Sequence, residues 1–384
     1  MKKIFVIVAA ALSVLATSSC DIRSRAANLF CKQADTVIYD LPATSPEIPL
    51  LQADRTLDET ARILAGMDVL PDSPIAYWME KPLWQTHKAQ MDELWATCTA
   101  TLDQVEALAN TDFADINAKV ETVFYPFSGP DFAYASSFYP KAKNYWLFAL
   151  EGTGKVPDMA ATTEWSFAQY RKALLYHLQH SYFITMQMMG DLHNATIDGT
   201  IPILMVFLAR KNYHILSINY KTVQADGTLA DSENPSNAVE IKFFNTAENV
   251  ERSLYFVSAN IENSNFAYPV RNLIEKLDPE TTAGYTKACS YCMHWDSFSL
   301  IRNYMLNHTF AVIQDDTGVR YSAFNKDIWD ITLYGGYTRP LSCFSMAVFQ
   351  YDLNNVYQAN QGIKPLGFRH GYNQPSSLIV ARKK

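Results

Sequence analysis

Motifs for nucleic-acid binding and for the commonest kinds of catalysis are missing from this sequence. It has no run of Lys or Arg, and 39 acidic against 32 basic residues give a net charge of −7. Because nucleic-acid binding depends on positive charge, this balance argues against nucleic acid as a partner. There is no G-x-S-x-G turn, no Walker loop and no clear catalytic triad. These absences exclude the hydrolases and the nucleoside triphosphatases that such motifs define.

Cysteine is also scarce, with six in 384 residues. Cys289 and Cys292 form the only C-x-x-C, whereas a four-cysteine zinc site needs a second pair. A c-type haem needs His directly after the second Cys, and Met293 stands there. Three interpretations of this pair remain: a redox pair at a helix N-terminus, a structural disulfide, or two separate core thiols.

No apolar run is long enough to cross a membrane. Ile4–Leu15 has twelve residues and Ile201–Ala209 has nine, against about twenty for a spanning helix. The first run follows two lysines and precedes the small residues 16–19. This layout predicts a secretory signal peptide over residues 1–19.

Cys20 directly follows the small residues, and this arrangement resembles the lipobox of bacterial lipoproteins. The resemblance implies that Cys20 is lipidated and becomes the mature N-terminus. The membrane would then be a partner through the lipid anchor. We expect the protein in the bacterial cell envelope, on its periplasmic face or at the cell surface. Ordinary cleavage near Ser19 and an uncleaved anchor are the alternatives.

The mature chain divides into a tether and one large domain. Residues 20–51 carry three prolines, show no sustained periodicity and hold at most a short strand at Thr36–Tyr39, so they predict a tether. The remaining residues, 52–384, show no internal repeat. The chain is 48% hydrophobic and 18% charged, as expected of a globular protein. We predict a single α/β domain with a helical N-terminal layer over 52–118.

The helical layer begins with Thr56 and Glu59, spaced as in a capping box. This predicts a helix from Thr56 to Leu64. A long amphipathic helix should follow Pro82, because apolar residues recur there at steps of three and four. A cofactor box is the alternative to core packing for that stripe, which contains Trp84, His87, Met91, Leu94, Trp95, Cys98, Leu102, Val105 and Leu108.

The clearest local pattern is a strand, a turn, a helix and a second strand. Strands are predicted at Val120–Phe127 and Lys143–Leu150. Between them, Ser128-Gly129-Pro130-Asp131 is typical of a helix start, with Ser128 or Gly129 as the cap and a helix over Pro130–Phe138. Two strands joined by one helix and running the same way predict a parallel βαβ unit. The fold class is therefore α/β, with a Rossmann-like mixed sheet and flanking helices.

Further helices and strands are expected along the rest of the chain. The predicted helices are Glu164–Leu192, Ile201–Ala209, Pro269–Leu277 and Tyr291–Asn307. The predicted strands are Tyr213–Val223, Val239–Asn245, Ser253–Ile261, Ala311–Gln314, Val319–Phe324, Ile331–Tyr334, Cys343–Gln350 and Ser377–Ala381. Residues 315–318 should form a hairpin turn between two of these strands.

A Rossmann-type ligand would lie at the turn that follows the first strand of the βαβ unit. Glu151, about 20 residues further on, has the place of the carboxylate that binds a ribose hydroxyl. Gly129 is the only glycine where the fingerprint has three, Pro130 removes a backbone donor, and Asp131 adds negative charge. The pattern thus predicts a structural helix start, a site for a neutral or cationic ligand, or a nucleotide-type cofactor site that resembles a methyltransferase.

Histidines supply the remaining candidates. His177 and His180 are three residues apart on one predicted helix, but no H-E-x-x-H frames them, so we expect hydrogen-bonded core residues and no metal site. The candidate pocket residues are Ser128, Gly129, Asp131, Glu151 and His180. Two polar-aromatic clusters, residues 294–296 and 369–372, are further candidates for lining a pocket.

Three segments together resemble a family of uncharacterised bacterial lipoproteins, of Bacteroidetes type. They are the aromatic-SGPD turn at Phe124–Phe132, followed by a strand that ends in Leu150-Glu151; His180–Phe183; and Gln314–Gly318. The resemblance implies export and lipid anchoring and supplies no activity.

Two functions follow as expectations. The first is a non-enzymatic, lipid-anchored protein that binds a small molecule or an envelope protein. The alternative is an enzyme with a carboxylate-lined pocket at the carboxyl edge of the strands, with a methyltransferase-like site. An enzyme should bring Asp131, Glu151 and a histidine together in one concave pocket. The cofactor is left open.

Overall fold

The computed structural model describes residues 50–183, 188, 190–192, 197–266, 269–344 and 347–384. These residues belong to one compact unit, Pro46–Lys384. The signal peptide, Cys20 and the strand at 36–39 lie outside the described residues.

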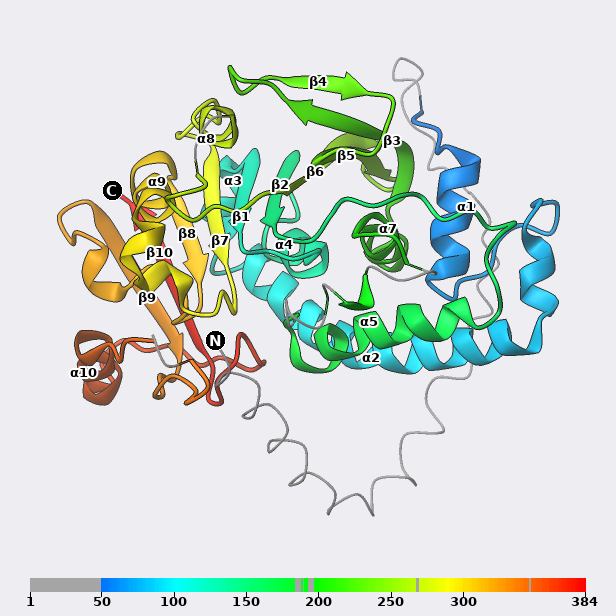
Figure 1. Ribbon diagram of the computed structural model, residues 1–384. Helices are drawn as coiled ribbons and strands as arrows, with labels where there is room; N and C mark the ends of the chain where they lie inside the picture. The colour runs from blue at the N-terminus through cyan, green and yellow to red at the C-terminus, as the bar shows by residue number, and fades with distance from the viewer. Residues whose placement is uncertain (1–49, 184–187, 189, 193–196, 267–268, 345–346) are drawn as a thin grey trace, which may run out of the picture. The chain divides into compact units, whose positions relative to one another are not determined.

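A ten-stranded mixed sheet forms the centre of the molecule (Figure 1). Its order is β4-β3-β5-β6-β2-β1-β7-β8-β10-β9, which confirms the predicted α/β class. The strands are β1 (Thr122–Pro126), β2 (Asn144–Ala149), β3 (His214–Val223), β4 (Leu229–Ser232), β5 (Ala238–Asn245), β6 (Val250–Ser258), β7 (Thr282–Thr286), β8 (Ala311–Gln314), β9 (Trp329–Gly335) and β10 (Ser377–Lys383).

Five adjacent strands, β6-β2-β1-β7-β8, are parallel. Along the chain, β1 is followed outward by β2 and β6, and the chain then returns to place β7 and β8 on the other side of β1. This is the 3-2-1-4-5 arrangement of a Rossmann-like sheet, and the order reverses between β1 and β7. The antiparallel strand β10 lies between β8 and β9. The hairpin partners β3, β4 and β5 extend the other end.

Helices cover both faces of the sheet (Figure 1). Alternate residues of β1 point to opposite sides: Val123 and Tyr125 belong to one hydrophobic core and Phe124 to the other. The first core contains side chains of α1 (Arg55–Leu64), α2 (Pro82–Asn110), α3 (Ala114–Lys119), α4 (Phe132–Phe138), α5 (Ser166–His180) and α7 (Ile201–Arg210). The second contains those of α8 (Val270–Ile274) and α9 (Ser299–His308). Helix α10 (Tyr351–Ala359) packs on β9 and β10 in a small third core.

The predicted helical N-terminal layer is present, but its first cap is different. Helix α1 begins at Arg55, and Asp54 Oδ1 accepts from Leu57 N at 3.0 Å, so the capping box at Thr56 was wrong. Glu59 instead accepts from Arg55 and from the Ser73 hydroxyl. The stripe of α2 is core: the buried members are Trp84, His87, Met91, Cys98, Leu102 and Val105.

Four predicted elements of the later chain were wrong in whole or in part. The helix expected over Tyr291–Asn307 begins only at Ser299, after two 3₁₀ turns at Cys292–His294 and Asp296–Phe298. The helix from Glu164 breaks at Ser181, which has a left-handed φ of 69°. Residues 319–324 form no strand, because the Gln314 side chain bonds both the N–H and the carbonyl of Val319 and a 3₁₀ turn, Tyr321–Ala323, follows. Strand β8 pairs with β7 and β10 instead. The described residues of 343–350 also form no strand.

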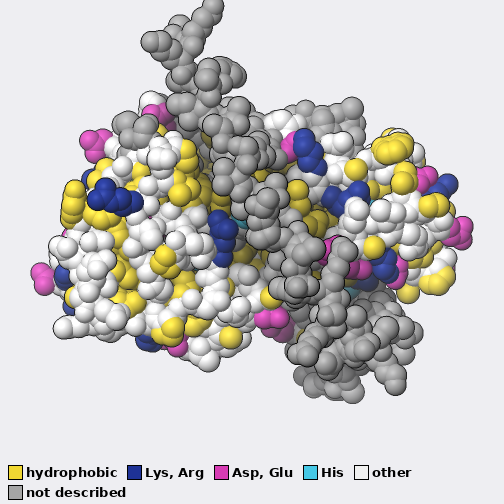
Figure 2. Space-filling view, turned by 90° about the horizontal axis from the view of Figure 1, so that it is seen from below, with side chains coloured by type: hydrophobic (Ala, Val, Ile, Leu, Met, Phe, Trp, Pro, Cys, Tyr) yellow, Lys and Arg dark blue, Asp and Glu magenta, His cyan; other side chains and the backbone are white. Residues whose placement is uncertain are grey.

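On the uncovered part of the face in Figure 2, Lys and Arg side chains are scattered among acidic and apolar ones and form no large basic patch. Within the described residues, none of the helices has the length and apolar character that crossing a membrane requires.

Candidate functional site

A pocket lies at the carboxyl edge of the parallel strands, where the strand order reverses. Its volume is about 230 Å³. The loops that follow β1, β2, β6 and β7 all contribute to its wall. The lining residues are Phe127, Gly129, Phe148, Ala149, Leu150, Glu151, Ala259, Asn260, Ile261, Ala288, Cys289, Ser290, Cys292 and Phe298. In open α/β sheets this is where ligands bind.

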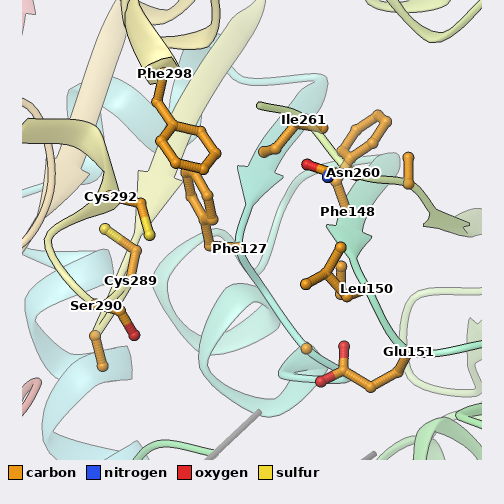
Figure 3. Close-up of a pocket in the computed structure, with 14 residues that line it drawn as sticks. Phe127, Phe148, Leu150, Glu151, Asn260, Ile261, Cys289, Ser290, Cys292 and Phe298 are labelled. Carbon is orange, nitrogen blue, oxygen red and sulfur yellow. The ribbon is translucent and has the colours of Figure 1, made fainter. Parts of the chain in front are cut away.

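The pocket is mainly apolar, with polar groups at intervals (Figure 3). The rings of Phe127 and Phe298 meet edge to face, with centroids 5.3 Å apart. Figure 3 shows Cys289 and Ser290 on one side of the cavity, across from Leu150 and Glu151 on the other. Flat apolar walls with a few polar groups are typical of small-molecule sites.

Backbone strain is concentrated on the loops of this pocket. Phe127, Ala288, Ser290 and Tyr291 have φ values of 59°, 52°, 53° and 58°. Side-chain-bearing residues rarely adopt positive φ, and bulky ones least of all. Conformations of this kind cost roughly 1–3 kcal/mol each and cluster at functional sites. The strained residues therefore lie in the same loops that form the pocket, which supports a functional role for this part of the molecule.

Among the residues that the structure describes, Glu151 is the one charged residue that lines the pocket. It directly follows Leu150 at the end of β2, and its side chain is only 2% exposed. Figure 3 shows its carboxylate turned back toward the loop that follows β1. The described part of the wall thus offers a negative group and no positive one.

Ser128 and Gly129 lie in the turn after β1, but neither caps α4. The Ser128 hydroxyl donates to Phe148 O at 3.3 Å, which ties the turn to β2. Gly129, with φ of 53°, lines the pocket. Asp131 is the cap, since its Oδ1 accepts from Tyr134 N at 3.2 Å and the helix begins at Phe132. The predicted start at Pro130 was wrong by two residues.

Asp131 does not line the pocket, because it lies among side chains of the α4 face of the sheet. It is 1% exposed and forms an ion pair with Lys287, with Oδ2 and Nζ 2.7 Å apart. Tyr125 donates to the same oxygen at 3.0 Å, and His177 Nε2 lies 3.3 Å from Oδ1. Burial lowers the pKa of His177 to about 3, so its ring is neutral.

Lys287 is the charged partner that sequence patterns did not reveal. It follows β7, is 3% exposed, and places Nζ 3.3 Å from the ring centroid of Tyr134. Burial lowers its pKa, while Asp131 favours the charged form. Because Ala288 lines the pocket, this pair anchors the pocket loop after β7 to the turn after β1.

Asp315 and Asp316 form a second buried acidic group, at the end of β8. Asp315 accepts from Ala288 N at 2.9 Å, and Asp316 accepts from Tyr291 at 2.9 Å and from Ser377 at 3.0 Å. Burial, and then the neighbouring Asp316 charge, raises the pKa of Asp315 to about 7. The two aspartates had been assigned to a hairpin turn, and only the sheet topology places them behind the pocket loop.

His180 lies apart from both carboxylates that were grouped with it. Its Nδ1 is 3.4 Å from Arg369 Nη1, and its ring packs against Tyr176 with centroids 4.9 Å apart. The structure therefore brings Gly129 and Glu151 to the pocket and leaves Ser128, Asp131 and His180 outside its lining.

Cys289 and Cys292 are both free thiols that line the pocket. Cys289 donates to Thr317 O at 2.9 Å. Burial raises the pKa of Cys289 and raises that of Cys292 to about 11, so neither is activated as a thiolate. The two cysteines lie at the ends of a turn, which is closed by a hydrogen bond from Cys292 N to Cys289 O at 3.0 Å.

Among the described residues, no three His, Cys, Asp or Glu side chains gather as a metal site would require. No protein-family model, curated protein or solved structure gave a significant match to this chain.

Proposed function

We propose that this chain binds a small organic ligand, uncharged or cationic, in the pocket at the strand edge. The observation that carries the proposal is the lining itself. Phe127, Phe148 and Phe298 supply flat apolar surfaces, and Glu151 is the only charged residue among the described residues of the wall. Glu151 follows the second strand of the parallel order, where Rossmann-like folds bind ribose hydroxyls. A nucleoside, with a flat base and a vicinal diol, fits this chemistry.

A phosphate is unsuited to this pocket. The turn after β1 has one glycine, Pro130 has no N–H, and none of the described residues that line the cavity is Lys, Arg or His. Phosphate sites instead use successive backbone N–H groups at a helix N-terminus. We therefore expect nucleosides to bind more tightly than the corresponding nucleotides.

The test is a calorimetric titration with adenosine, S-adenosylmethionine, ATP and NAD. We expect saturable binding of the first two and none of the last two. Replacing Glu151 by Gln should weaken adenosine binding about 10- to 100-fold, because a hydrogen bond to a charged group contributes roughly 1.5–3 kcal/mol. Glu93→Gln, on the exposed side of α2, is the matched control. Equal affinity of E151Q and the wild type would refute the assignment.

An enzyme is the second candidate. The pocket does not bring Asp131, Glu151 and a histidine together, which counts against an enzyme, whereas the strand order favours one. Antiparallel β10 between β8 and β9 gives the order 3-2-1-4-5-7-6, which resembles methyltransferase-type Rossmann folds. The same titration separates the two candidates. Conversion of S-adenosylmethionine to S-adenosylhomocysteine, dependent on Glu151, would support the enzyme, whereas recovery of unchanged ligand supports a binding protein.

We also propose that the protein is exported and held on the cell envelope by lipid on Cys20, which the N-terminal sequence supports. Cys20→Ala should move the protein from the membrane fraction to the soluble fraction of cells, since no acyl chains would then anchor it. Cys343→Ala, which removes an exposed thiol, is the control. Persistence of C20A in the membrane fraction would contradict lipid anchoring at this residue.

A further inference from the structure

A second group of polar and aromatic side chains lies beside the pocket. Tyr372 connects the two places: its hydroxyl donates to Ala288 O and lies 3.3 Å from Ser290 Oγ, both in the pocket wall. On its other side the Tyr372 ring meets those of Tyr182 and Phe344, with centroids 4.7 and 4.9 Å away. One side chain thus separates this group from the pocket.

Arg369 is the charge in this group, and its contacts are weak. Its Nη1 is 3.4 Å from His180 Nδ1, its Nη2 is 3.3 Å from Tyr372 O, and its guanidinium lies 5.9 Å from the Tyr182 ring centroid. Its Nε is buried without a hydrogen bond to the described residues. Arg302, by contrast, donates to two carbonyls at 2.9 and 3.0 Å.

No carboxylate of the described residues lies within ion-pair distance of Arg369, although acidic residues outnumber basic ones in the chain. Outside the described residues, those between 183 and 347 include no Asp or Glu, whereas residues 1–49 include Asp21, Asp35, Asp40 and Glu47. A guanidinium stays charged in proteins. Within the described part of the chain this half-buried charge has no counter-ion, and burying a charge in that way is costly.

The surroundings of Arg369 suit one class of ligand. A guanidinium presents a planar fork that matches a carboxylate. Burial, and then the Arg369 charge, lowers the pKa of His180, so its ring is neutral. With Nδ1 accepting from Arg369, the ring proton lies on Nε2 and is a further donor. The rings of Tyr182, Tyr372 and Phe344 supply an apolar wall for stacking.

We propose that Arg369, His180, Tyr182 and Tyr372 form a second binding site, which takes the carboxylate of a small aromatic acid. The site does not require the pocket to bind a nucleoside. If both are occupied, two ligands lie on either side of the Ser290–Tyr372 contact.

The test is a titration with phenylacetate followed by protein NMR. Phenylacetamide, which has the same ring but no charge, is the control compound. We expect phenylacetate to bind saturably and phenylacetamide to bind at least tenfold more weakly. Arg369→Gln should weaken phenylacetate binding at least tenfold. Arg339→Gln, which removes a guanidinium 5.2 Å from the Phe349 ring elsewhere on the surface, should leave it unchanged. Equal binding of the two probes, or equal affinity of R369Q and the wild type, overturns the proposal.

Arg369→Lys keeps the charge and removes the fork, and it serves if R369Q does not fold. It should still bind phenylacetate several-fold more weakly than the wild type, and unchanged affinity counts against the site. Adenosine titrated into the same samples separates the two proposals. Binding of phenylacetate alone supports the second site and refutes the pocket ligand, and binding of adenosine alone does the reverse.

Discussion

Replacing Lys287 by methionine is expected to cost about 3–5 kcal/mol of unfolding free energy. The change keeps most of the side-chain length and removes the charge that neutralises Asp131, whose Oδ2 is 2.7 Å from Nζ. Both side chains are nearly fully buried, at 1% and 2% exposure. Breaking such a pair leaves an uncompensated buried charge, which is more costly than losing the attraction itself. Urea denaturation followed by circular dichroism measures the loss.

Two further variants make this result specific to the buried charge. Asp131→Asn in the K287M background removes the orphaned charge and retains a good helix cap, so the double variant should recover at least half of the loss. Lys143→Met breaks an ion pair with Glu121 of similar length, 2.8 Å, whose members are 57% and 51% exposed. That variant should cost less than about 1 kcal/mol. If K287M lowers the unfolding free energy no more than K143M does, the ion pair between Lys287 and Asp131 does not stabilise the fold as proposed.

The Asp315 carboxyl should make the protein less stable as pH rises from about 4 to about 7. Its pKa is about 7 in the fold against 3.8 without it, so between these values the unfolded chain has released a proton that the folded chain retains. The stabilisation is complete below 3.8 and is lost as pH rises through 7. At about 1.4 kcal/mol per pKa unit, the full effect is on the order of 4 kcal/mol.

The joint contribution of Asp315 and Asp316 can be tested with Asp316→Asn. This change removes the like charge that raises the pKa of Asp315, while the hydroxyls of Tyr291 and Ser377 can bond either an amide or a carboxylate. Unfolding free energies of D316N should therefore vary less between pH 4 and 7 than those of the wild type. The difference also contains the titration of Asp316 itself, whose pKa burial raises, so it reports the two aspartates together. Groups away from this pair titrate equally in both proteins. Asp330→Asn, whose aspartate is 74% exposed, should leave the profile unchanged; parallel profiles for D316N and the wild type would contradict the assignment.

Local patterns were sufficient for the centre of the fold. The alternation of β1, the turn at 128–131 and the strand at β2 are encoded within some thirty residues, and their parallel pairing is confirmed. The stripe of α2 likewise needs only helical spacing to be recognised as core. Such features depend on neighbours in sequence, so the sequence alone suffices to predict them.

The interior of the site depends on neighbours in space. Lys287 and Asp131 are far apart in the chain and meet because β7 lies beside β1. Asp315 resembled a turn residue because its partner, Ala288 N, comes from another loop. The sequence analysis places His180 in one pocket with Asp131, whereas in the structure His177, one turn earlier, faces the carboxylate. No spacing rule distinguishes these histidines without the sheet order.

In the sequence, β3, β4 and β5 come between β2 and β6, which are neighbours in the sheet. This order affects how the chain can fold. β1 pairs residue 122 with residue 282, and β2 pairs residue 144 with residue 253. Closing such long loops must precede any gain from pairing, so parallel sheets of this kind form slowly. Until residue 282 becomes available, the apolar strand Thr122–Pro126 has an open edge that can pair with another chain. A chain that emerges N-terminus first therefore needs protection from aggregation until β7, Thr282–Thr286, has emerged.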